Sequence, residues 1–393
     1  MQVLNPPAET NLHVGTGDIK QRHALQREPA AAETPSLNNT PRPISDLKFV
    51  SVVLSDARRL VLQPASVDLI VTSPPYWRKR DYGLKEQIGQ EETPEEYVDE
   101  LVSALDGWRH CLRPTGSVFL NIGDTYHKGD LVDIPSRVMA AARAHGWIVR
   151  NRIIWVKTNG LPDPVKNRLV SRHEFIIHLT TGRDYYYDLF AFADRYGTGA
   201  NPGDVWMINQ RLNARKHLAP YPAEIAERAM TLACPEEVCP ACNSPRRRIV
   251  RRTMELNPDR PQAKRAMELA LAGGLTDEHI AAIQAFGISD AGKAREFQEG
   301  TGRNSEEVQR LAAEAKAVLG GYFREFTFPL RKSDGWTDCQ CGQEFMPGVV
   351  LDPFMGTGTT IKAAWKMGRS AIGADLSRQS IRSFNDVTDE MFA

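Results

Sequence analysis

No apolar stretch in the 393-residue sequence is long enough to span a membrane, and none with a positive flank occurs at the N-terminus. We therefore expect a cytoplasmic protein with no membrane partner. An excess of either charge is also lacking, because 49 Lys and Arg residues balance 49 Asp and Glu residues. Net charge thus gives no indication of a nucleic-acid partner, and any DNA-binding surface has to be a local concentration of Lys and Arg.

Cysteine is scarce, with six residues, of which five lie in the C-terminal half of the chain. This distribution is unlike a secreted disulfide scaffold and is more typical of a metal site. Cys239 and Cys242 have the spacing of half a zinc knuckle, and Cys339 and Cys341 offer a second pair. We predict a structural Zn²⁺ site with these four thiolates as ligands. Cys234 could replace one of them, and the alternative is that the cysteines are simply buried and reduced.

The composition is that of an ordinary globular protein, with 41% hydrophobic and 25% charged residues. A chain of 393 residues is long enough for one large α/β domain and a second module. The polar N-terminal stretch 1–46 shows no periodicity and is predicted to be disordered. Alternating strand and helix patterns predict a doubly wound, mostly parallel sheet formed by 47–233 and 343–393. Residues 234–342, where the alternation stops, are predicted to be a helical insert with a zinc ribbon that serves target recognition.

One helix has a particularly clear start. Thr93 can cap it, Pro94 suits its first position, and Glu96 completes a capping box. Before this helix, the apolar stretch 67–71 is predicted to be a buried strand, and Thr-Ser-Pro-Pro-Tyr-Trp (72–77) follows it. In open parallel sheets, ligands bind at the ends of strands, so this proline-stiffened loop is a candidate binding site. As an isolated sequence it could equally be a surface turn.

A glycine turn lies near the other end of the chain, at Asp-Pro-Phe-Met-Gly-Thr-Gly-Thr-Thr (352–360). Gly356 and Gly358 allow a ligand to approach the backbone closely, and the free N–H groups of the following helix favour an anionic group. Asp375 ends the next predicted strand, where it can accept hydrogen bonds from ribose hydroxyls. Ile361 occupies the third glycine position of the dinucleotide fingerprint, which disfavours a nicotinamide or flavin enzyme. Glycines needed only for packing are the remaining alternative.

Together, the two segments resemble the motifs of S-adenosylmethionine-dependent DNA amino-methyltransferases. The base-binding motif precedes the cofactor motif, which is the permuted order of the beta class of that family. The resemblance implies a Rossmann-like methyltransferase sheet, S-adenosylmethionine as cofactor, double-stranded DNA as partner, and a possible cognate restriction endonuclease. It implies cofactor contacts from Asp352, Pro353, Phe354, Gly356, Gly358, Thr359, Thr360, Asp375, Asn121, Asp124 and His217. Asp352 is expected to meet the cofactor's ammonium group.

The chemistry of the first motif follows from its residue types. An exocyclic base amine is a poor nucleophile, and Ser73 Oγ and the Pro74 carbonyl can both accept hydrogen bonds from it. Pro74 and Pro75 fix the loop, while Tyr76 offers a stacking face to the base. These four residues are the predicted catalytic group. The target nucleotide has to be flipped out of the duplex to reach them.

Ser73 also bears on the identity of the base. In the family, an acidic or amide residue at this position usually accompanies transfer to adenine N6, and serine usually accompanies transfer to cytosine N4. We therefore predict a cytosine-N4 enzyme, with adenine N6 as the alternative. Methylation at cytosine C5 needs a thiolate, normally in a Pro-Cys dipeptide, which this sequence lacks. A catalytically inactive DNA-binding protein and an RNA amino-methyltransferase are further alternatives.

Two basic segments are candidates for DNA contact. The first follows the catalytic loop directly and comprises Trp77, Arg78, Lys79 and Arg80. The second is the densest basic run of the chain and supplies Arg246, Arg247, Arg248, Arg251 and Arg252. Phosphate contacts of this kind position a protein without reading sequence, and a solvated strand is the alternative for the second run. Residues 276–286 and 289–297 have the rhythm of a helix–turn–helix reader, although bundle packing gives the same rhythm.

Overall fold

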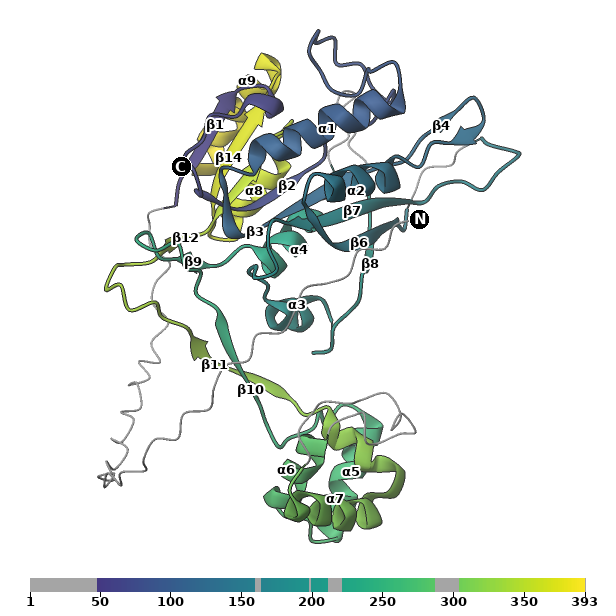
Figure 1. The fold of residues 1–393 in the computed structure, drawn as a ribbon, viewed down its shortest axis with the longest axis vertical. Helices are drawn as coiled ribbons and strands as arrows, with labels where there is room; N and C mark the ends of the chain where they lie inside the picture. The colour runs from purple at the N-terminus through teal and green to yellow at the C-terminus, as the bar shows by residue number, and fades with distance from the viewer. Residues whose placement is uncertain (1–47, 160–163, 198, 211–220, 287–303, 393) are drawn as a thin grey trace, which may run out of the picture. The chain divides into compact units, whose positions relative to one another are not determined.

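The central feature of the structure is an eight-stranded sheet with the strand order β1-β14-β13-β2-β3-β7-β6-β8 (Figure 1). The computed structural model describes residues 48–159, 164–197, 199–210, 221–286 and 304–392. The strands of the sheet are β1 (Val50–Leu54), β2 (Val67–Thr72), β3 (Leu112–Ile122), β6 (Ile148–Lys157), β7 (His173–Thr180), β8 (Val205–Ile208), β13 (Val349–Asp352) and β14 (Ser370–Asp375). Neighbouring strands are parallel except in the two pairs that involve β7. The prediction of an α/β fold with a mostly parallel sheet is confirmed.

Strands from the two ends of the described chain lie side by side in this sheet. Strand β13 pairs with β14 on one side and with β2 on the other, where Leu351 is opposite Ile70. All residues of β13 and β2 are buried, as expected for parallel strands that are covered on both faces. Because parallel strands end at the same edge, the segments that follow β1, β2, β13 and β14 meet there.

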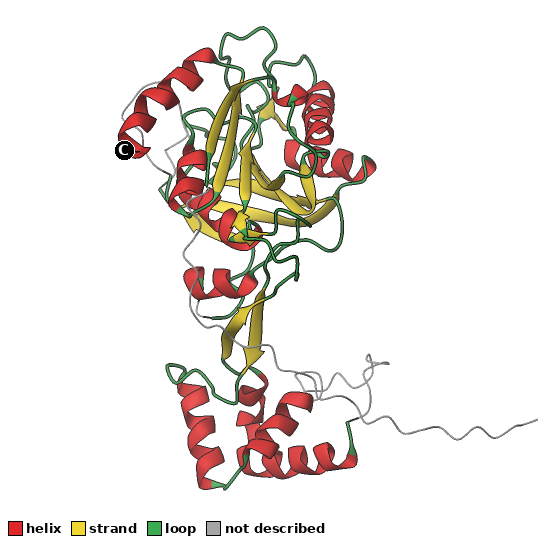
Figure 2. Cartoon of the chain, turned by 90° about the vertical axis from the view of Figure 1, so that its left-hand side faces the viewer, coloured by secondary structure: helices red, strands yellow, loops and turns green. Residues whose placement is uncertain are grey.

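Helices cover both faces of the sheet (Figure 2). Helices α1 (Pro94–Trp108) and α2 (Ile134–Ala144) contribute to one hydrophobic core, together with the short 3₁₀ helix η1 (Ala57–Arg59). Helices α3 (Leu189–Tyr196), α4 (Ala223–Ala233), α8 (Thr359–Lys366) and α9 (Arg378–Phe392) contribute to a second core. None of the helices in the described segments is both long enough and apolar enough to cross a membrane.

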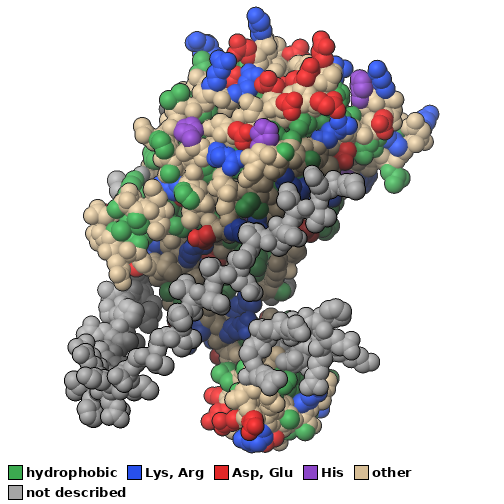
Figure 3. Space-filling view, in the orientation of Figure 1, with side chains coloured by type: hydrophobic (Ala, Val, Ile, Leu, Met, Phe, Trp, Pro, Cys, Tyr) green, Lys and Arg blue, Asp and Glu red, His purple; other side chains and the backbone are tan. Residues whose placement is uncertain are grey.

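Helix α1 begins as predicted. The Glu96 N–H donates a 3.2 Å hydrogen bond to Thr93 Oγ1, and the Thr93 N–H donates a 3.1 Å bond to the Glu96 carboxylate. Tyr97 and Leu101 bury the inner face of the helix. Acidic side chains gather over its outer face (Figure 3). This face would repel phosphates, so a DNA surface is expected elsewhere.

Between α4 and β13 the chain forms a two-stranded ribbon and a small helical cluster. The elements are β9 (Glu237–Val238), β10 (Arg248–Arg252), α5 (Pro261–Ala272), α6 (Asp277–Phe286), α7 (Glu306–Leu319), the 3₁₀ helix η2 (Gly320–Thr327), β11 (Arg331–Trp336) and β12 (Met346–Pro347). Strands β10 and β11 pair antiparallel, as do β9 and β12. The helices have a hydrophobic core of their own, which includes Ile283, Leu319 and Phe323.

Several predictions about organisation stay untested. The helix α6 matches the first half of the predicted helix–turn–helix, whereas the second half, 289–297, lies outside the described residues. The predicted disordered stretch 1–46 also lies outside them. The boundaries of the insert at 234 and 342 stay predictions.

A minor hairpin, β4 (Tyr126–His127) with β5 (Asp130–Leu131), follows β3.

Candidate active site

A cavity of about 270 Å³ lies at the carboxyl edge of the sheet and is lined by both predicted motifs. Ser73 and Pro75 come from the loop after β2, and Pro353 and Gly356 come from the turn after β13. Asp375, the last residue of β14, completes this group. The structure therefore brings the proline loop and the glycine turn to one cavity, although they are far apart in the sequence.

The glycine turn adopts a conformation that few other residues could take. Gly356 and Gly358 have φ values of 51° and 74°. A Cβ on Gly358 would lie 2.2 Å from the ring of Phe384 in α9. The Gly356 N–H donates a 2.8 Å hydrogen bond to Asp375, and the Ser377 N–H donates one of 2.7 Å. Burial raises the pKa of Asp375, although these N–H donors oppose the shift. The turn thus holds this carboxylate against the cavity wall, within reach of a ligand's hydroxyl groups.

Asp352, predicted as a cofactor residue, contacts the proline loop's strand and the start of α8. Its carboxylate is buried and accepts hydrogen bonds from the Thr72 hydroxyl at 2.6 Å, the Phe354 N–H at 3.1 Å and the Thr360 hydroxyl. Burial raises its pKa to about 6 despite these donors. Both oxygens accept hydrogen bonds from protein donors, and Asp352 is not among the residues that line the cavity. Asp352 therefore connects the ends of β2 and β13, and its contact with the cofactor's ammonium group stays a prediction.

The other predicted cofactor residues differ in their surroundings. Phe354 lines the cavity and packs edge-on against Trp108, with ring centroids 6.1 Å apart. Thr359 and Thr360 begin α8, and Thr360 is buried, with its hydroxyl bonded to Tyr221 and Asp352. The Asp124 carboxylate accepts from the Thr125 and Ile134 N–H groups at 2.8 and 3.1 Å, which fixes the start of α2. His217 lies outside the described residues.

The proline loop is held by a polar cluster beneath it. Tyr76 Oη donates a 2.5 Å hydrogen bond to Glu174, and Asn121 Nδ2 donates to Tyr76 Oη at 2.8 Å and to Ser73 Oγ at 3.3 Å. A Cβ on Gly123 would lie 2.7 Å from the Tyr76 ring, so this ring packs directly on the backbone of Gly123. Asn121, predicted as a cofactor residue, thus contacts the predicted catalytic loop.

Glu174 and its partner Lys157 have no place among the residues predicted from the sequence. They lie on the neighbouring strands β7 and β6, and Lys157 Nζ contacts the Glu174 carboxylate. A polar residue at the start of an apolar strand is the only signal of Glu174 in the sequence. Glu174 lies near the proline loop because β7 is antiparallel to its neighbours. The start of β7 is therefore at the edge of the sheet where the parallel strands end.

The residues that follow the proline loop divide into buried and exposed ones. Trp77 is only 2% exposed, and its indole N–H donates to the Glu91 carbonyl at 3.0 Å. Its predicted side-chain contact with DNA is therefore wrong for this conformation, because the ring is part of the core. Arg78 adopts φ 52° and donates to the Glu92 carbonyl at 2.8 Å. Arg78, Lys79 and Arg80 are exposed, and their contact with DNA stays a prediction.

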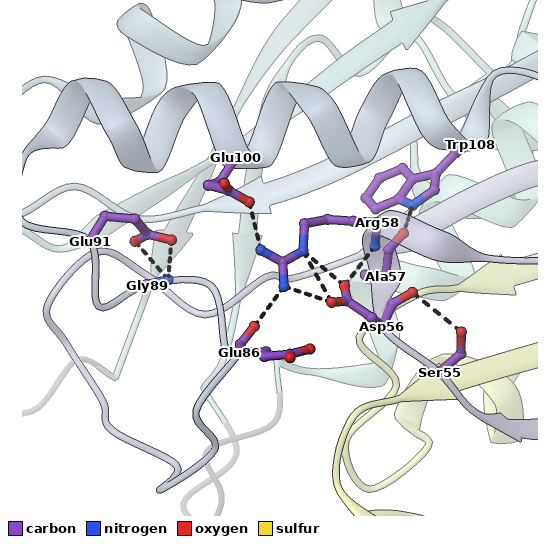
Figure 4. Close-up of polar contacts among 9 residues, drawn as sticks. All are labelled: Ser55, Asp56, Ala57, Arg58, Glu86, Gly89, Glu91, Glu100 and Trp108. Carbon is purple, nitrogen blue, oxygen red and sulfur yellow. Dashed lines mark hydrogen bonds and ion pairs between the residues drawn. The ribbon is translucent and has the colours of Figure 1, made fainter.

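A further wall of the cavity is formed by the loop 82–88, which Arg58 holds in place (Figure 4). The Arg58 guanidinium donates to the Glu86 carbonyl at 2.8 Å, to the Asp56 carboxylate at 2.6 Å and to the Glu100 carboxylate at 2.6 Å. Figure 4 shows this guanidinium between the three oxygen groups. One side chain thus connects η1, α1 and the loop. Asp56 and Arg58 were not among the sequence-predicted site residues.

The four predicted metal ligands come together. The sulfur atoms of Cys239, Cys242, Cys339 and Cys341 all lie within 4.8 Å of one another. Thiolates on a tetrahedral zinc ion are separated by roughly 3.8 Å, since each Zn–S bond measures about 2.3 Å. The group therefore fits a zinc ion after small adjustments. Cys234 is buried in the second core and is not part of the group, so the structure favours the four-cysteine set over the one with Cys234.

The basic run of the ribbon divides into two parts with different surroundings. Arg246, Arg247 and Arg248 form ion pairs with Glu237, Asp184 and Asp188 at 2.7, 2.8 and 2.9 Å. To contact a phosphate, as predicted, each of these arginines would have to leave its carboxylate partner. The ion pairs attach the arginines to neighbouring acidic side chains. Arg251 lies 3.6 Å from Asp334.

The exposed end of the ribbon carries like charges opposite each other. Arg252 is the cross-strand partner of Arg331, and among the described residues neither has an acidic side chain within ion-pairing distance. Like charges in this arrangement repel, so an anionic group that binds both would be favoured.

Comparison with known proteins provides independent information. A family model described as DNA methylase, for N6 and N4 methyltransferases, matches residues 67–238 and 344–386. The type II methyltransferase M.Cfr9I of Citrobacter freundii is 35% identical over 208 residues, which cover 45% of this chain and 69% of the relative. The type II methyltransferase M.SmaI of Serratia marcescens is 33% identical over 217 residues, which cover 46% of this chain and 74% of the relative.

A solved structure has the same fold. The PvuII DNA methyltransferase, described as cytosine-N4-specific, matches with a TM-score of 0.50 and 15% sequence identity. The match covers 86% of this chain and 85% of the PvuII chain. At this level of identity the likeness concerns the fold alone.

Proposed function

This chain belongs to the DNA methylase family of N6 and N4 amino-methyltransferases, and on that premise we propose that it transfers a methyl group from S-adenosylmethionine to the exocyclic N4 of a cytosine flipped out of duplex DNA. The observation that carries the proposal is the cavity that Ser73 and Asp375 both line. Donor and acceptor have to meet in one enclosed space, and this cavity lies at the ends of the strands where that family's two motifs converge.

The cofactor half of the site is assigned to the glycine turn and its neighbours. S-adenosylmethionine supplies an electrophilic methyl group on a sulfonium. Asp375 accepts hydrogen bonds from its ribose hydroxyls, and Pro353 and Phe354 form an apolar wall beside it. Gly356 and Gly358 let the backbone approach, and Asp352 supports the turn from below. His217 stays a prediction for the methionine end.

The base half is assigned to the proline loop. Ser73 Oγ and the Pro74 carbonyl accept hydrogen bonds from the amine, so they stabilise the positive charge on nitrogen as its lone pair bonds to the methyl carbon. The electrons of the broken carbon–sulfur bond stay on sulfur, and the amine proton leaves to solvent. Serine at position 73 is the reason for favouring cytosine N4, and adenine N6 is the alternative.

Double-stranded DNA is the proposed partner of the exposed basic groups. Lys79 and Arg80 lie beside the proline loop, where they can contact the phosphates that flank the flipped nucleotide. Arg252 and Arg331 offer a second phosphate contact on the ribbon. The four-cysteine group is proposed to bind a structural zinc ion at the base of the ribbon. A cognate restriction endonuclease stays a prediction.

The test uses the purified chain, labelled S-adenosylmethionine and duplex DNA, followed by digestion to nucleosides and mass spectrometry. N4-methylcytosine is the expected product, and N6-methyladenine would replace the proposed base. DNA binding without any transfer would favour an inactive binding protein, and preferential labelling of RNA would favour an RNA enzyme. Ser73→Ala should lower turnover roughly a hundredfold while cofactor affinity hardly changes. Modification-sensitive sequencing of DNA from expressing cells would then give the recognition sequence.

A further inference from the structure

The shortest polar contact beneath the proline loop comes from a residue outside both motifs. Glu174 Oε2 lies 2.5 Å from Tyr76 Oη and 3.0 Å from Asn121 Nδ2. The other carboxylate oxygen accepts from Lys157 Nζ. The side chains of Glu174 and Lys157 are 14% and 18% exposed, so both charges are largely removed from water. A buried ion pair of this kind is costly to keep unless its geometry serves a purpose.

The carboxylate dictates the direction of the hydrogen bonds around it. An ionised carboxylate can only accept, so Tyr76 donates its proton to Glu174 and Asn121 presents Nδ2. The Tyr76 oxygen keeps lone pairs, and the Ser73 hydroxyl donates to it over 3.3 Å. Burial and the negative charge of Glu174 raise the pKa of Tyr76 well above its ordinary value, so the phenol retains the proton that it donates.

We propose that Glu174, held by Lys157, is a positioning residue that directs the Ser73 hydroxyl proton away from the substrate amine. This inference rests on the proposed function. Ser73 donates to Tyr76 and Tyr76 donates to Glu174, while Asn121 Nδ2 donates to one lone pair of Ser73 Oγ. The second lone pair of Ser73 Oγ is thus left to accept from the amine. If these hydrogen bonds had the opposite direction, Tyr76 would donate to Ser73 Oγ. The lone pair that has to accept from the substrate amine would then be occupied.

Asn121 responds to the same carboxylate. Because Nδ2 faces Glu174, its Oδ1 has to point away, and this buried oxygen has no hydrogen-bond partner among the described residues. A buried acceptor without a partner is unfavourable in the free protein and is satisfied when a ligand supplies a donor. Glu174 thus orients two acceptors, Ser73 Oγ and Asn121 Oδ1, through contacts that touch neither oxygen directly.

The discriminating variant is Glu174→Gln, because an amide has a donor end and an acceptor end. The Lys157 ammonium attracts the amide oxygen, which turns the amide NH₂ toward Tyr76 and reverses the chain. We expect kcat at saturating DNA and cofactor to fall about 30- to 100-fold, with the KM for S-adenosylmethionine within about threefold of wild type. Asp106→Asn removes another hydrogen-bonded carboxylate, away from the cavity, and serves as the control with unchanged turnover.

The second variant is Glu174→Gln combined with Lys157→Met. Without the ammonium, the amide oxygen is free to face Tyr76, so the double variant should turn over about tenfold faster than Glu174→Gln alone. Recovery on removal of a second group is not expected of a merely structural residue. Wild-type turnover in Glu174→Gln, or a double variant as slow as or slower than the single one, would overturn the inference.

The same series separates this inference from the proposed function. If the wild-type chain transfers no methyl group to DNA, the function fails, whereas an active wild type with an unaffected Glu174→Gln defeats only the positioning role. Thermal melting and cofactor binding report whether each variant folds. If Glu174→Gln does not fold, Tyr76→Phe carries the test, because it removes the acceptor of the Ser73 proton. A loss of about tenfold in kcat supports the inference, and wild-type turnover contradicts it.

Discussion

The hydroxyl of Thr72 donates a 2.6 Å hydrogen bond to the carboxylate of Asp352, a residue 280 positions away in the sequence. Thr72 ends β2 and Asp352 ends β13, and both side chains are buried. The next residue in each case, Ser73 or Pro353, lines the cavity. This single bond therefore joins the strand that leads to the proline loop with the strand that leads to the glycine turn.

The raised pKa of Asp352 predicts how stability depends on pH. Burial raises the pKa to about 6 in the folded chain, while the unfolded chain has an ordinary value near 3.8. Between these values the folded state binds more protons, so stability should increase as the pH falls through this window and be lowest above it. Compared with Asp352→Asn, the wild type should gain up to roughly 3 kcal/mol between pH 7 and pH 4. Urea unfolding at several pH values measures the difference.

Asp106 provides a control of opposite sign. Burial alone would raise its pKa, but hydrogen bonds from His145, Trp147 and Arg109 outweigh burial and lower it. Its contribution to stability is therefore present above the unfolded pKa and lost as the pH falls through the folded value. Compared with Asp106→Asn, the wild type should become less stable toward low pH. If the stability difference from Asp352→Asn and that from Asp106→Asn change with pH in the same direction, the raised pKa assigned to Asp352 is contradicted.

Gly358 should not tolerate a side chain. In Gly358→Ala, the new Cβ would lie 2.2 Å from the Phe384 ring and the residue would have to keep φ 74°. We expect a loss of about 3 kcal/mol in unfolding free energy together with a loss of cofactor binding. Gly356→Ala has no atom within 4 Å of its Cβ and should cost only about 1 kcal/mol of backbone strain. Denaturant unfolding and cofactor titration measure both effects.

A compensating substitution tests the steric reason. Phe384→Leu shortens the opposing side chain, so Gly358→Ala combined with Phe384→Leu should recover part of the stability lost in Gly358→Ala. If the stability loss of the double variant equals the sum of the losses of the two single variants, the loss in Gly358→Ala arises from the backbone conformation alone.

The sequence could predict those parts of the fold that depend on local patterns. The capping box at Thr93 and Glu96, the buried run of β2 and the glycine turn each depend on neighbouring residues, and each was found where expected. The mostly parallel sheet followed from the alternation of strand and helix patterns. Cysteine spacing also identified the four thiols that come together.

What the sequence could not supply depends on contacts between distant segments. The direction of β7 decides that Glu174 lies under the proline loop, and no local pattern carries that direction. The hydrogen bond between Thr72 and Asp352 joins residues 280 positions apart, so no local pattern predicts it. Trp77 is followed in sequence by three charged residues (78–80), yet its ring is buried in the core.

The cysteine group should make stability depend on zinc. We expect one zinc ion per chain, and Cys339→Ser should remove most of it and lower the melting temperature of the chain. Cys234→Ala alters a buried cysteine outside the group and should keep the full zinc content. Elemental analysis together with thermal melting, before and after chelation, measures both. A zinc-free preparation whose melting temperature chelators do not change would contradict the prediction.

The facing arginines of the ribbon should act through salt-dependent DNA binding. Arg252 and Arg331 are cross-strand partners with no acidic partner in the described segments, so each is free to neutralise a phosphate. Arg252→Gln and Arg331→Gln should each weaken binding to any duplex sequence and reduce the slope of log K against log salt by about one. Arg248 is 18% exposed and paired with Asp188, so Arg248→Gln should lower thermal stability and leave the slope nearly unchanged. Arg137→Gln, on the acidic α1 side, is the neutral control. Salt titrations of binding measure the slopes, and equal slopes in wild type and both ribbon variants would exclude phosphate contact at this pair.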